Sequence, residues 1–198
     1  MKHVSEYFSI WGLGLSMTKT VAVLITRRKD NPDSVKLYVH HSEVKVERKA
    51  KFIGVVFEDK LSLAPHIDYV VDRCKSRLNM MRAISGTTWS SSKTVVKTVY
   101  IALIRSILDY GSLAFDCATN EAKEKLDAIH GQALRICAGA MPGTSRAALP
   151  NDLGELPLHL RRRMLQAQYA VRVENTTDQP DTAVFQDCWQ LHYGSYQK

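Results

Sequence analysis

The 198-residue sequence has little of what marks a membrane-spanning or secreted protein. Its most apolar stretch, Val95 to Leu108, is too short to span a bilayer and is interrupted by Lys97 and Arg105. The segment from Met1 to Ile10 has no sustained apolar run, so it has the pattern of neither a secretory signal nor a transit peptide. We therefore expect an intracellular protein, nuclear or cytoplasmic, with no membrane contact.

Cysteine is scarce as well, and its spacing excludes the usual metal motifs. The four cysteines form no C-x-x-C pair and no histidines stand at matching distances, so we expect no zinc and no other metal site in this chain. Cys74 and Cys137 fall on apolar helical faces, where a cysteine behaves as a small hydrophobic residue. In a reducing compartment we expect all four cysteines to be free thiols.

Acidic residues are outnumbered by basic ones, 20 against 27, and the excess is uneven. Lysines and arginines number 11 against 7 acidic residues in 1–60, 7 against 3 in 61–113, and 9 against 10 in 114–198. A basic half of this kind favours a polyanionic partner such as nucleic acid. A basic surface that only keeps the protein soluble explains the same charge.

Hydrophobic periodicity divides the chain into strands followed by helices. The strand candidates are residues 20–26, 35–39, 43–48 and 51–57, with a turn at 27–33, and we expect a small antiparallel β-meander. Beyond Leu61 the apolar period changes from two to 3.6. This period predicts four helices: from about residue 65 to before 86, over 95–108, over 120–138 and over 157–174. Ser90–Ser92 can cap the second of them, and we expect a break in helical structure at 150–157.

This order of elements predicts an α+β fold, in which a β-meander precedes a helical bundle. We expect three regions: residues 1–62 with the strands, residues 63–174 with the helices, and a loosely ordered tail over 175–198. The tail mixes polar residues with isolated aromatic ones and shows no period.

Five short stretches carry a family pattern, in a fixed order. They are WGLGLSMTKT at 11–20, KFIGVVFEDKLSL at 51–63 with His66-Ile67 after it, LIRSILDYG at 103–111, QALRICAGA at 132–140 and GELPL at 154–158. Together they resemble the segments that follow the catalytic centre in reverse transcriptases of non-LTR, LINE-type retrotransposons of the jockey and I-like kind. The first stretch departs from the family by compressed spacing between Trp11 and Gly12.

The resemblance implies the end of the palm, the primer-grip hairpin, the thumb and the connection region of an RNA-directed DNA polymerase. Such polymerases hold two Mg²⁺ ions on palm aspartates, which precede the Lys-Thr segment. This sequence contains no Asp-Asp pair, and we interpret Asp59 as a turn residue and not as a metal ligand. The resemblance therefore predicts a truncated fragment that lacks the catalytic aspartates and is inactive by itself, with Mg²⁺ expected only for the complete polymerase.

Lys19 is the candidate for a direct chemical role. By resemblance it lies near the incoming triphosphate, where it can donate a proton to the leaving pyrophosphate in a complete enzyme; a surface lysine at the start of a strand is the alternative. Lys51, Phe52 and Gly54 resemble the primer grip, in which glycine lets the backbone approach a nucleic-acid strand. A bulge glycine in a sheet explains Gly54 equally well.

Basic residues on the first thumb-like helix can follow the phosphates of a primer–template duplex, although a solvated helix face is the alternative. These residues are Arg73, Lys75, Arg77 and Arg82. Arg105 interrupts an apolar helix, so we expect it to reach the surface or to pair with Asp109. Three arginines, Arg161–Arg163, begin the last helix, where the helix dipole disfavours positive charge; an anionic partner is one hypothesis and an exposed face is the other.

The leading hypothesis for function is binding of an RNA/DNA primer–template duplex, with the missing catalytic half as a second possible partner. The alternative is a relic or domesticated reading frame that acts as a helical scaffold or protein-interaction module without a nucleic-acid role. The aromatic residues Trp89, Trp189 and Tyr193 are suited to stacking on bases, but packing explains them more simply.

Overall fold

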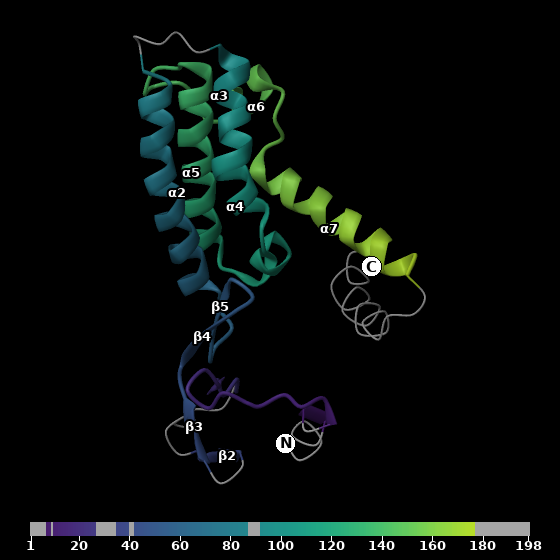
Figure 1. Ribbon diagram of the computed structural model, residues 1–198. Helices are drawn as coiled ribbons and strands as arrows, with labels where there is room; N and C mark the ends of the chain where they lie inside the picture. The colour runs from purple at the N-terminus through teal and green to yellow at the C-terminus, as the bar shows by residue number, and fades with distance from the viewer. Residues whose placement is uncertain (1–6, 9, 27–34, 40–41, 87–91, 177–198) are drawn as a thin grey trace. The chain divides into compact units, whose positions relative to one another are not determined.

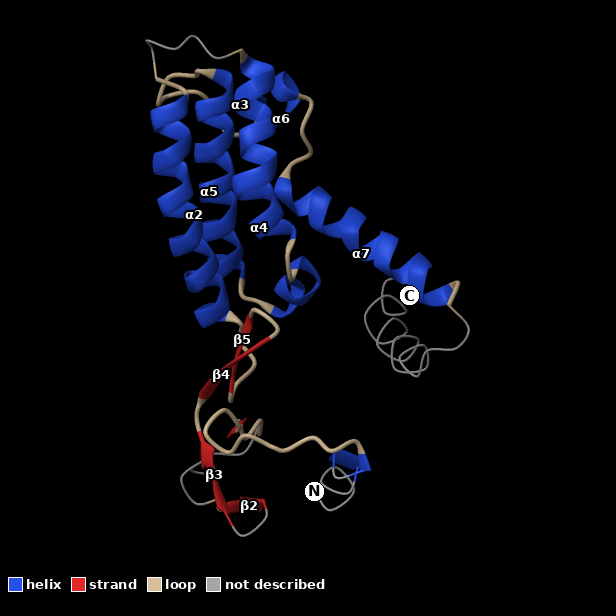
Figure 2. Cartoon of the chain, viewed as in Figure 1, coloured by secondary structure: helices blue, strands red, loops and turns tan. Residues whose placement is uncertain are grey.

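The computed structural model describes residues 7–8, 10–26, 35–39, 42–86 and 92–176. Within these ranges a short helical stretch at Tyr7, Phe8 and Ile10 comes first, and the strands and then the other helices follow (Figure 1, Figure 2). The chain divides into two compact units, one formed by Met1–Tyr69 with Cys117–Lys123 and the other by Val70–Asp116 with Glu124–Lys198. Helix α2 (Ala64–Ile84) runs through this division, so its first turns belong to the first unit.

Two small sheets form the strand-bearing part of the first unit. Strands β1 (Val21–Ala22), β3 (Ser42–Val46) and β2 (Leu37–Val39) lie in this order, with β2 antiparallel and β1 parallel to β3. Strands β4 (Lys49–Phe52) and β5 (Val55–Glu58) form a second, antiparallel sheet. The predicted single antiparallel meander is therefore wrong, because the long connection between β1 and β2 lets β1 join β3 in the parallel sense.

The β4–β5 pair is a hairpin where the hydrophobic pattern predicts one strand. Phe52 faces Val55 across a two-residue turn in which Ile53 and Gly54 both have positive φ, 44° and 80°. Such a type I′ turn has the twist that suits two antiparallel strands. Glycine adopts this conformation without strain, whereas β-branched Ile53 does not. A hairpin over these residues agrees with what the family resemblance implies.

The second unit is helical and has its core between three long helical segments. The first is the remainder of α2. The second is a continuous rod of α3 (Lys93–Tyr100), the π-helix η2 (Ile101–Arg105) and α4 (Ser106–Asp109). The third, α5 (Asn120–Ala138), lies beside the other two (Figure 1). Their facing side chains are buried and include Cys74, Leu78, Met81, Tyr100, Ile104, Leu108, Leu126, Leu134 and Cys137.

The predicted helices over 65–85, 95–108 and 120–138 are confirmed. The Ser92 hydroxyl caps α3 by accepting a hydrogen bond from the Val95 amide at 3.4 Å, and Gly139 closes α5 with φ 61°. Cys74 and Cys137 are buried free thiols, as predicted. No helix of the described residues is long and apolar enough to cross a membrane.

The remaining helices differ in part from the sequence prediction. A short 3-10 helix, η3 (Ser112–Cys117), was not predicted. Helix α6 (Ala148–Leu153) occupies part of the predicted break, because Pro150 lies in its first turn, where no amide partner is required. Helix α7 (Leu158–Glu174) confirms the last predicted helix and leaves the other helices obliquely (Figure 1).

Several predictions fall on residues that the structure does not describe. They concern the turn at 27–33, the aromatic residue Trp89, and almost all of the tail with Trp189 and Tyr193.

Candidate nucleic-acid interface

A depression of about 490 Å³ in the first unit collects basic and aromatic side chains. It is lined by Lys19, Val21, Val23, Ile25, Glu47, Lys49, Ala50, Lys51, Phe52 and Phe57. Three lysines and one acidic residue, Glu47, contribute to its lining, and Glu47 forms an ion pair with Lys45. The depression therefore has an excess of positive charge, which suits an anionic ligand.

Strand β4 supplies two of these lysines. Lys49 and Lys51 stand two residues apart, so the period of a strand turns them to the same face. Lys51 is fixed further: its Nζ donates to the Tyr69 hydroxyl at 2.8 Å and lies 4.5 Å from the centre of that ring. This contact combines a hydrogen bond with a cation–π attraction, so less side-chain freedom remains to be lost when Lys51 binds a ligand.

His66 supports the hairpin from the start of α2. Its Nδ1 accepts a hydrogen bond from the Val56 amide of β5 at 3.4 Å, and its ring stacks near Tyr69 with centroids 6.3 Å apart. Burial, and second the charge of Lys51, lower the pKa of His66. The imidazole is therefore neutral at pH 7, which lets Nδ1 accept the amide hydrogen bond.

Lys19 reaches the same depression from the segment before β1. The turn that precedes it is closed by the Lys19 amide, which donates to the Ser16 carbonyl at 3.1 Å. The Thr20 hydroxyl donates to the same carbonyl at 2.9 Å. The side chain of Lys19 is exposed.

Of the residues predicted from the sequence, Lys19, Lys51 and Phe52 thus line one depression, and Gly54 turns the hairpin that carries two of them. The sequence reasoning missed Lys49 and Phe57, which line it too, and Tyr69, which holds Lys51. The alternation of β4 was a signal for Lys49, while nothing in the sequence pointed to Tyr69.

The depression does not fit a Mg²⁺ site. Mg²⁺ is bound by carboxylates and other oxygen ligands, whereas this lining supplies three ammonium groups and one carboxylate. Asp59 lies outside it, in the turn after β5, where its amide donates to the Arg48 carbonyl at 3.1 Å. Within the described ranges, no three His, Cys, Asp or Glu residues are grouped so as to hold a metal ion.

The basic residues of α2 lie on the second unit, on two flanks of the helix: at about 100° per residue, Arg73 and Arg77 share one flank and Lys75 and Arg82 share the other. Arg73, Lys75 and Arg82 are exposed and Arg77 is half-buried. Lys75 Nζ lies 2.9 Å from Asp72 Oδ1, and Arg82 Nη1 donates to Asn79 Oδ1 at 2.7 Å. Both contacts are on the surface, so they leave these groups accessible to a phosphate.

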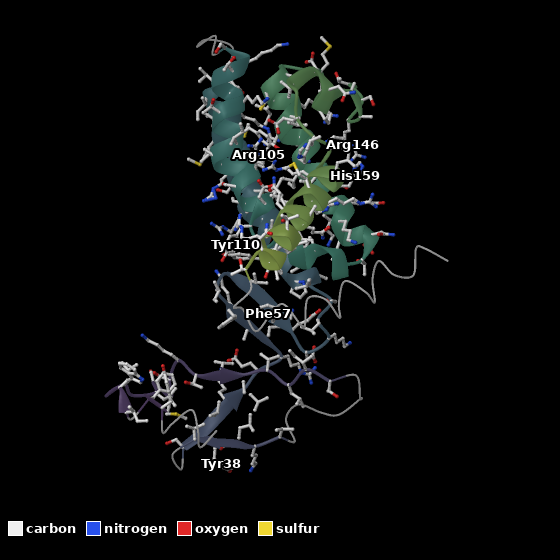
Figure 3. All side chains as sticks on the ribbon, turned by 90° about the vertical axis from the view of Figure 1, so that its right-hand side faces the viewer. Tyr38, Phe57, Arg105, Tyr110, Arg146 and His159 are labelled. Atoms are coloured by element: carbon white, nitrogen blue, oxygen red, sulfur yellow. The ribbon has the colours of Figure 1, made fainter. Side chains whose placement is uncertain are left out.

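Three other arginines have partners within the chain. Arg105 pairs with Glu155 and not with Asp109 as predicted; its Nη1 lies 3.1 Å and 2.9 Å from the two carboxylate oxygens. Asp109 instead accepts hydrogen bonds from Arg161. Figure 3 shows Arg105 on the side of the unit from which α7 leaves.

Arg162 Nη1 lies 3.4 Å from Asp127 Oδ1. Arg161 and Arg162 thus have anionic partners, as one hypothesis expected, but these are carboxylates of this chain that lie 52 and 35 residues away in the sequence, beyond the reach of a local pattern. Arg163 is exposed.

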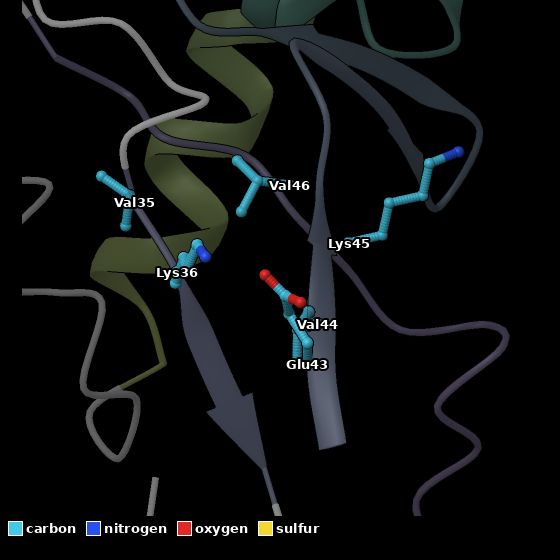
Figure 4. A pocket seen from close by; sticks show the side chains of 6 residues that line it. All are labelled: Val35, Lys36, Glu43, Val44, Lys45 and Val46. Atoms are coloured by element: carbon cyan, nitrogen blue, oxygen red, sulfur yellow. The ribbon is translucent and has the colours of Figure 1, made fainter. Parts of the chain in front are cut away.

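A second depression of about 400 Å³ lies over β2 and β3 (Figure 4). Its lining consists of Val35, Lys36, Glu43, Val44, Lys45 and Val46. It has two ammonium groups, one carboxylate and no aromatic side chain, so it is a weaker candidate for nucleic acid than the first depression.

Comparison with known proteins finds relatives among the proteins of retrotransposons. The chain is 21% identical, over 188 aligned positions, to the retrovirus-related Pol polyprotein from type-1 retrotransposable element R1 4 of Nasonia vitripennis. In Drosophila melanogaster it is 21% identical over 149 positions to the probable RNA-directed DNA polymerase from transposon X-element. It is 19% identical over 125 positions to the corresponding protein from transposon BS.

These alignments cover 87%, 75% and 63% of this chain, and 48%, 16% and 14% of the three relatives. The chain therefore spans about half the length of the first relative and a smaller part of the other two. No protein-family profile matches the chain, and no solved structure does. The similarity to three such proteins agrees with the resemblance read from the motifs: the chain is related to the RNA-directed DNA polymerases of non-LTR retrotransposons.

Proposed function

We propose that this chain corresponds to the part of a non-LTR reverse transcriptase that holds the primer–template, and that its own activity is binding of an RNA/DNA duplex. The depression lined by Lys19, Lys49, Lys51, Phe52 and Phe57 is the observation that carries this proposal. The names of two relatives, which describe them as probable RNA-directed DNA polymerases, support it.

The proposed binding depends on charge and not on base sequence. Lysine contacts to phosphates position a nucleic-acid strand without reading its bases, and they release condensed counterions. The Phe52 side chain is 66% exposed and, by the alternation of β4, stands on the strand face opposite Lys49 and Lys51, where it is free to contact a base or sugar. The β4–β5 hairpin would then act as the primer grip.

The exposed basic residues of α2 would supply further phosphate contacts from two flanks of the helix, as the thumb of the polymerase. Arg73, Lys75 and Arg82 are exposed there, and Lys75 would exchange its weak surface contact with Asp72 for a phosphate.

In the complete polymerase, Lys19 would lie beside the triphosphate and donate a proton to the pyrophosphate as it leaves. Palm aspartates would hold the two Mg²⁺ ions that stabilise the transferred charge. The residues of the depression would orient the primer strand.

The test is an anisotropy titration with a fluorescent RNA/DNA hybrid that has a recessed 3′ end, at 50 to 200 mM salt. The variant K19Q/K49Q/K51Q removes three charges from the depression. We expect its affinity to fall about tenfold or more, and the slope of log K against log salt to shrink by about 2 to 3. The matched control K60Q/K93Q/K125Q removes three exposed lysines that line neither depression and lie outside α2, and it should stay within about twofold of the wild type.

Equal losses in the variant and its control would show that net charge alone drives binding and would overturn the site. Salt-insensitive binding, or none below millimolar concentration, would overturn the nucleic-acid role. A protein partner that co-purifies stably without nucleic acid would then favour the scaffold alternative. Primer extension by this chain with Mg²⁺ and dNTPs would contradict the expectation that it is inactive by itself.

A further inference from the structure

Two cations of one helical rod converge on a buried carboxylate in the second unit. Glu155 lies in the connection between α6 and α7, and its side chain is 6% exposed. Lys97 Nζ lies 3.2 Å from Glu155 Oε1, and Arg105 Nη1 lies 2.9 Å from Oε2. Lys97 also donates to the Leu153 carbonyl at 2.6 Å. The α6–α7 connection is thus attached to the rod at two successive points.

The π-helix makes this convergence possible. Residues eight apart in an α-helix point about 80° away from each other, so Lys97 and Arg105 would not share a face of a regular helix. The π-helix Ile101–Arg105 lies between them, and its Ser106 amide bonds to the Ile101 carbonyl. A π turn takes more residues than an α turn, so each of its residues rotates less about the helix axis. The total rotation from Lys97 to Arg105 therefore comes closer to two whole turns, and both cations point toward Glu155.

The same π turn sets the direction of Asp109, one turn further along the rod. Asp109 accepts two hydrogen bonds from Arg161, in the first turn of α7. A regular α-helix through residues 101–105 would rotate Asp109 away from Arg161 together with Arg105. The contacts of Glu155 and Asp109, which hold the α6–α7 connection and the start of α7, therefore depend on one backbone irregularity, whereas the Arg162–Asp127 pair does not.

We propose that Glu155 and the π turn form a joint with two settings that controls the attachment of α7. In the setting seen here, the charged carboxylate binds Lys97 and Arg105 and stabilises the π turn, and Asp109 then holds Arg161. In the other setting, residues 101–105 form regular α-helix, Arg105 leaves Glu155, and Asp109 leaves Arg161. Helix α7, which leaves the other helices obliquely (Figure 1), is then released at its start.

Hydrogen exchange of the full chain, followed by mass spectrometry, tests the joint. Glu155→Gln keeps the shape of the side chain and removes its charge. We expect amides in the first two turns of α7 to exchange at least tenfold faster, while amides in the middle of α5 are unchanged. The control Glu124→Gln removes an exposed carboxylate of α5 and should leave α7 within twofold of the wild type. Unchanged exchange of α7 in Glu155→Gln would overturn the proposal.

A double variant separates a joint from two independent ion pairs. If Glu155 and Asp109 act through one π turn, Glu155→Gln/Asp109→Asn should exchange within about threefold of the faster single variant. If the exchange rate of the double variant equals the product of the two single increases, the two ion pairs act independently and the proposal is overturned. Should Glu155→Gln fail to fold, Arg105→Lys takes its place: it keeps the charge but loses the two-oxygen contact, so α7 should exchange at least threefold faster, and unchanged exchange would contradict the joint.

Discussion

Arg161 holds Asp109 by two parallel hydrogen bonds, from Nε to Oδ1 at 2.8 Å and from Nη2 to Oδ2 at 2.6 Å. The two side chains are only 16% and 23% exposed. The hydrogen bond to Asp109 is the main reason that the pKa of Arg161 is raised above its ordinary value. A two-point, largely desolvated pair of this kind is among the stronger polar contacts of a protein.

Replacing Asp109 by Asn should therefore lower the free energy of unfolding by about 2 kcal/mol, because a hydrogen-bonded charge loses its counterion. Urea titration measures this change. The control is Asp72→Asn, which breaks the Asp72–Lys75 pair, whose side chains are 74% and 63% exposed; it should cost less than about 0.5 kcal/mol. If the two substitutions lowered the free energy of unfolding equally, the expectation that the less exposed ion pair contributes more would be wrong.

Ile53→Asn should raise stability, by about 1 kcal/mol, because a β-branched residue is strained at the positive φ of a type I′ turn and Asn is favoured there. Ile53 is 72% exposed, so little apolar burial is lost. Gly54→Ala, at φ 80° in the same turn, is the opposite control and should destabilise by about 1 kcal/mol. Thermal and urea unfolding of both variants decide whether the turn is strained as described.

Acid should destabilise the second unit through His130. Its Nδ1 lies 3.3 Å from the hydroxyl of buried Tyr100, and burial is the main cause that lowers the pKa of His130. As the pH falls through the unfolded histidine pKa of about 6.5, the unfolded chain binds a proton at His130 and the folded chain does not, because its His130 pKa is lower. This contribution to stability is complete above the unfolded pKa and is lost as the pH falls below it.

His130→Gln should accordingly show a smaller loss of stability between pH 7 and pH 5 than the wild type, measured by urea unfolding at each pH. His66 shifts in the same direction, so the wild-type slope contains both residues and His66→Gln serves as the parallel measurement. A pH dependence that is unchanged in His130→Gln would show that this histidine does not titrate differently on folding.

The buried cysteines should react with a thiol reagent only when the protein opens. Burial raises the pKa of Cys74 to about 11 and that of Cys137 to about 12, and both side chains are inaccessible. In a C117S/C188S background, labelling at pH 8 should be at least about a hundredfold slower than in 6 M urea, because only the exposed thiolate reacts. Fast labelling without denaturant would show that the helices open locally.

The sequence predicted helices better than strands, for a physical reason. The bounds 120–138 of α5 and the extent of α2 follow from a 3.6-residue apolar period, which is local. The parallel pairing of Val21 with Lys45 depends on a distant partner, and so does the pairing of Arg105 with Glu155. No local sequence pattern predicts either pairing, and none predicts the π turn that ends at Arg105.

The candidate site was predicted in part. The resemblance pointed to Lys19, Lys51 and Phe52, which the structure places around one depression. It did not point to Tyr69, because the contact of this ring with Lys51 joins residues 18 apart in different elements. The basic residues of α2 lie on the surface, as an amphipathic helix dictates. Their role with nucleic acid stays a prediction.

The tight turn at Ile53–Gly54 also limits how this region can change in evolution. Side chains alternate along β4, so Lys49 and Lys51 share a face, and they stand opposite Glu58 and Val56 of β5 only while the present register is kept. Substitutions of either lysine would alter affinity by degrees. One inserted or deleted residue between Phe52 and Val55 would shift that register, so that both lysines lose their present cross-strand neighbours together. Chains of this kind should therefore vary in the charges of the hairpin long before they vary in its length.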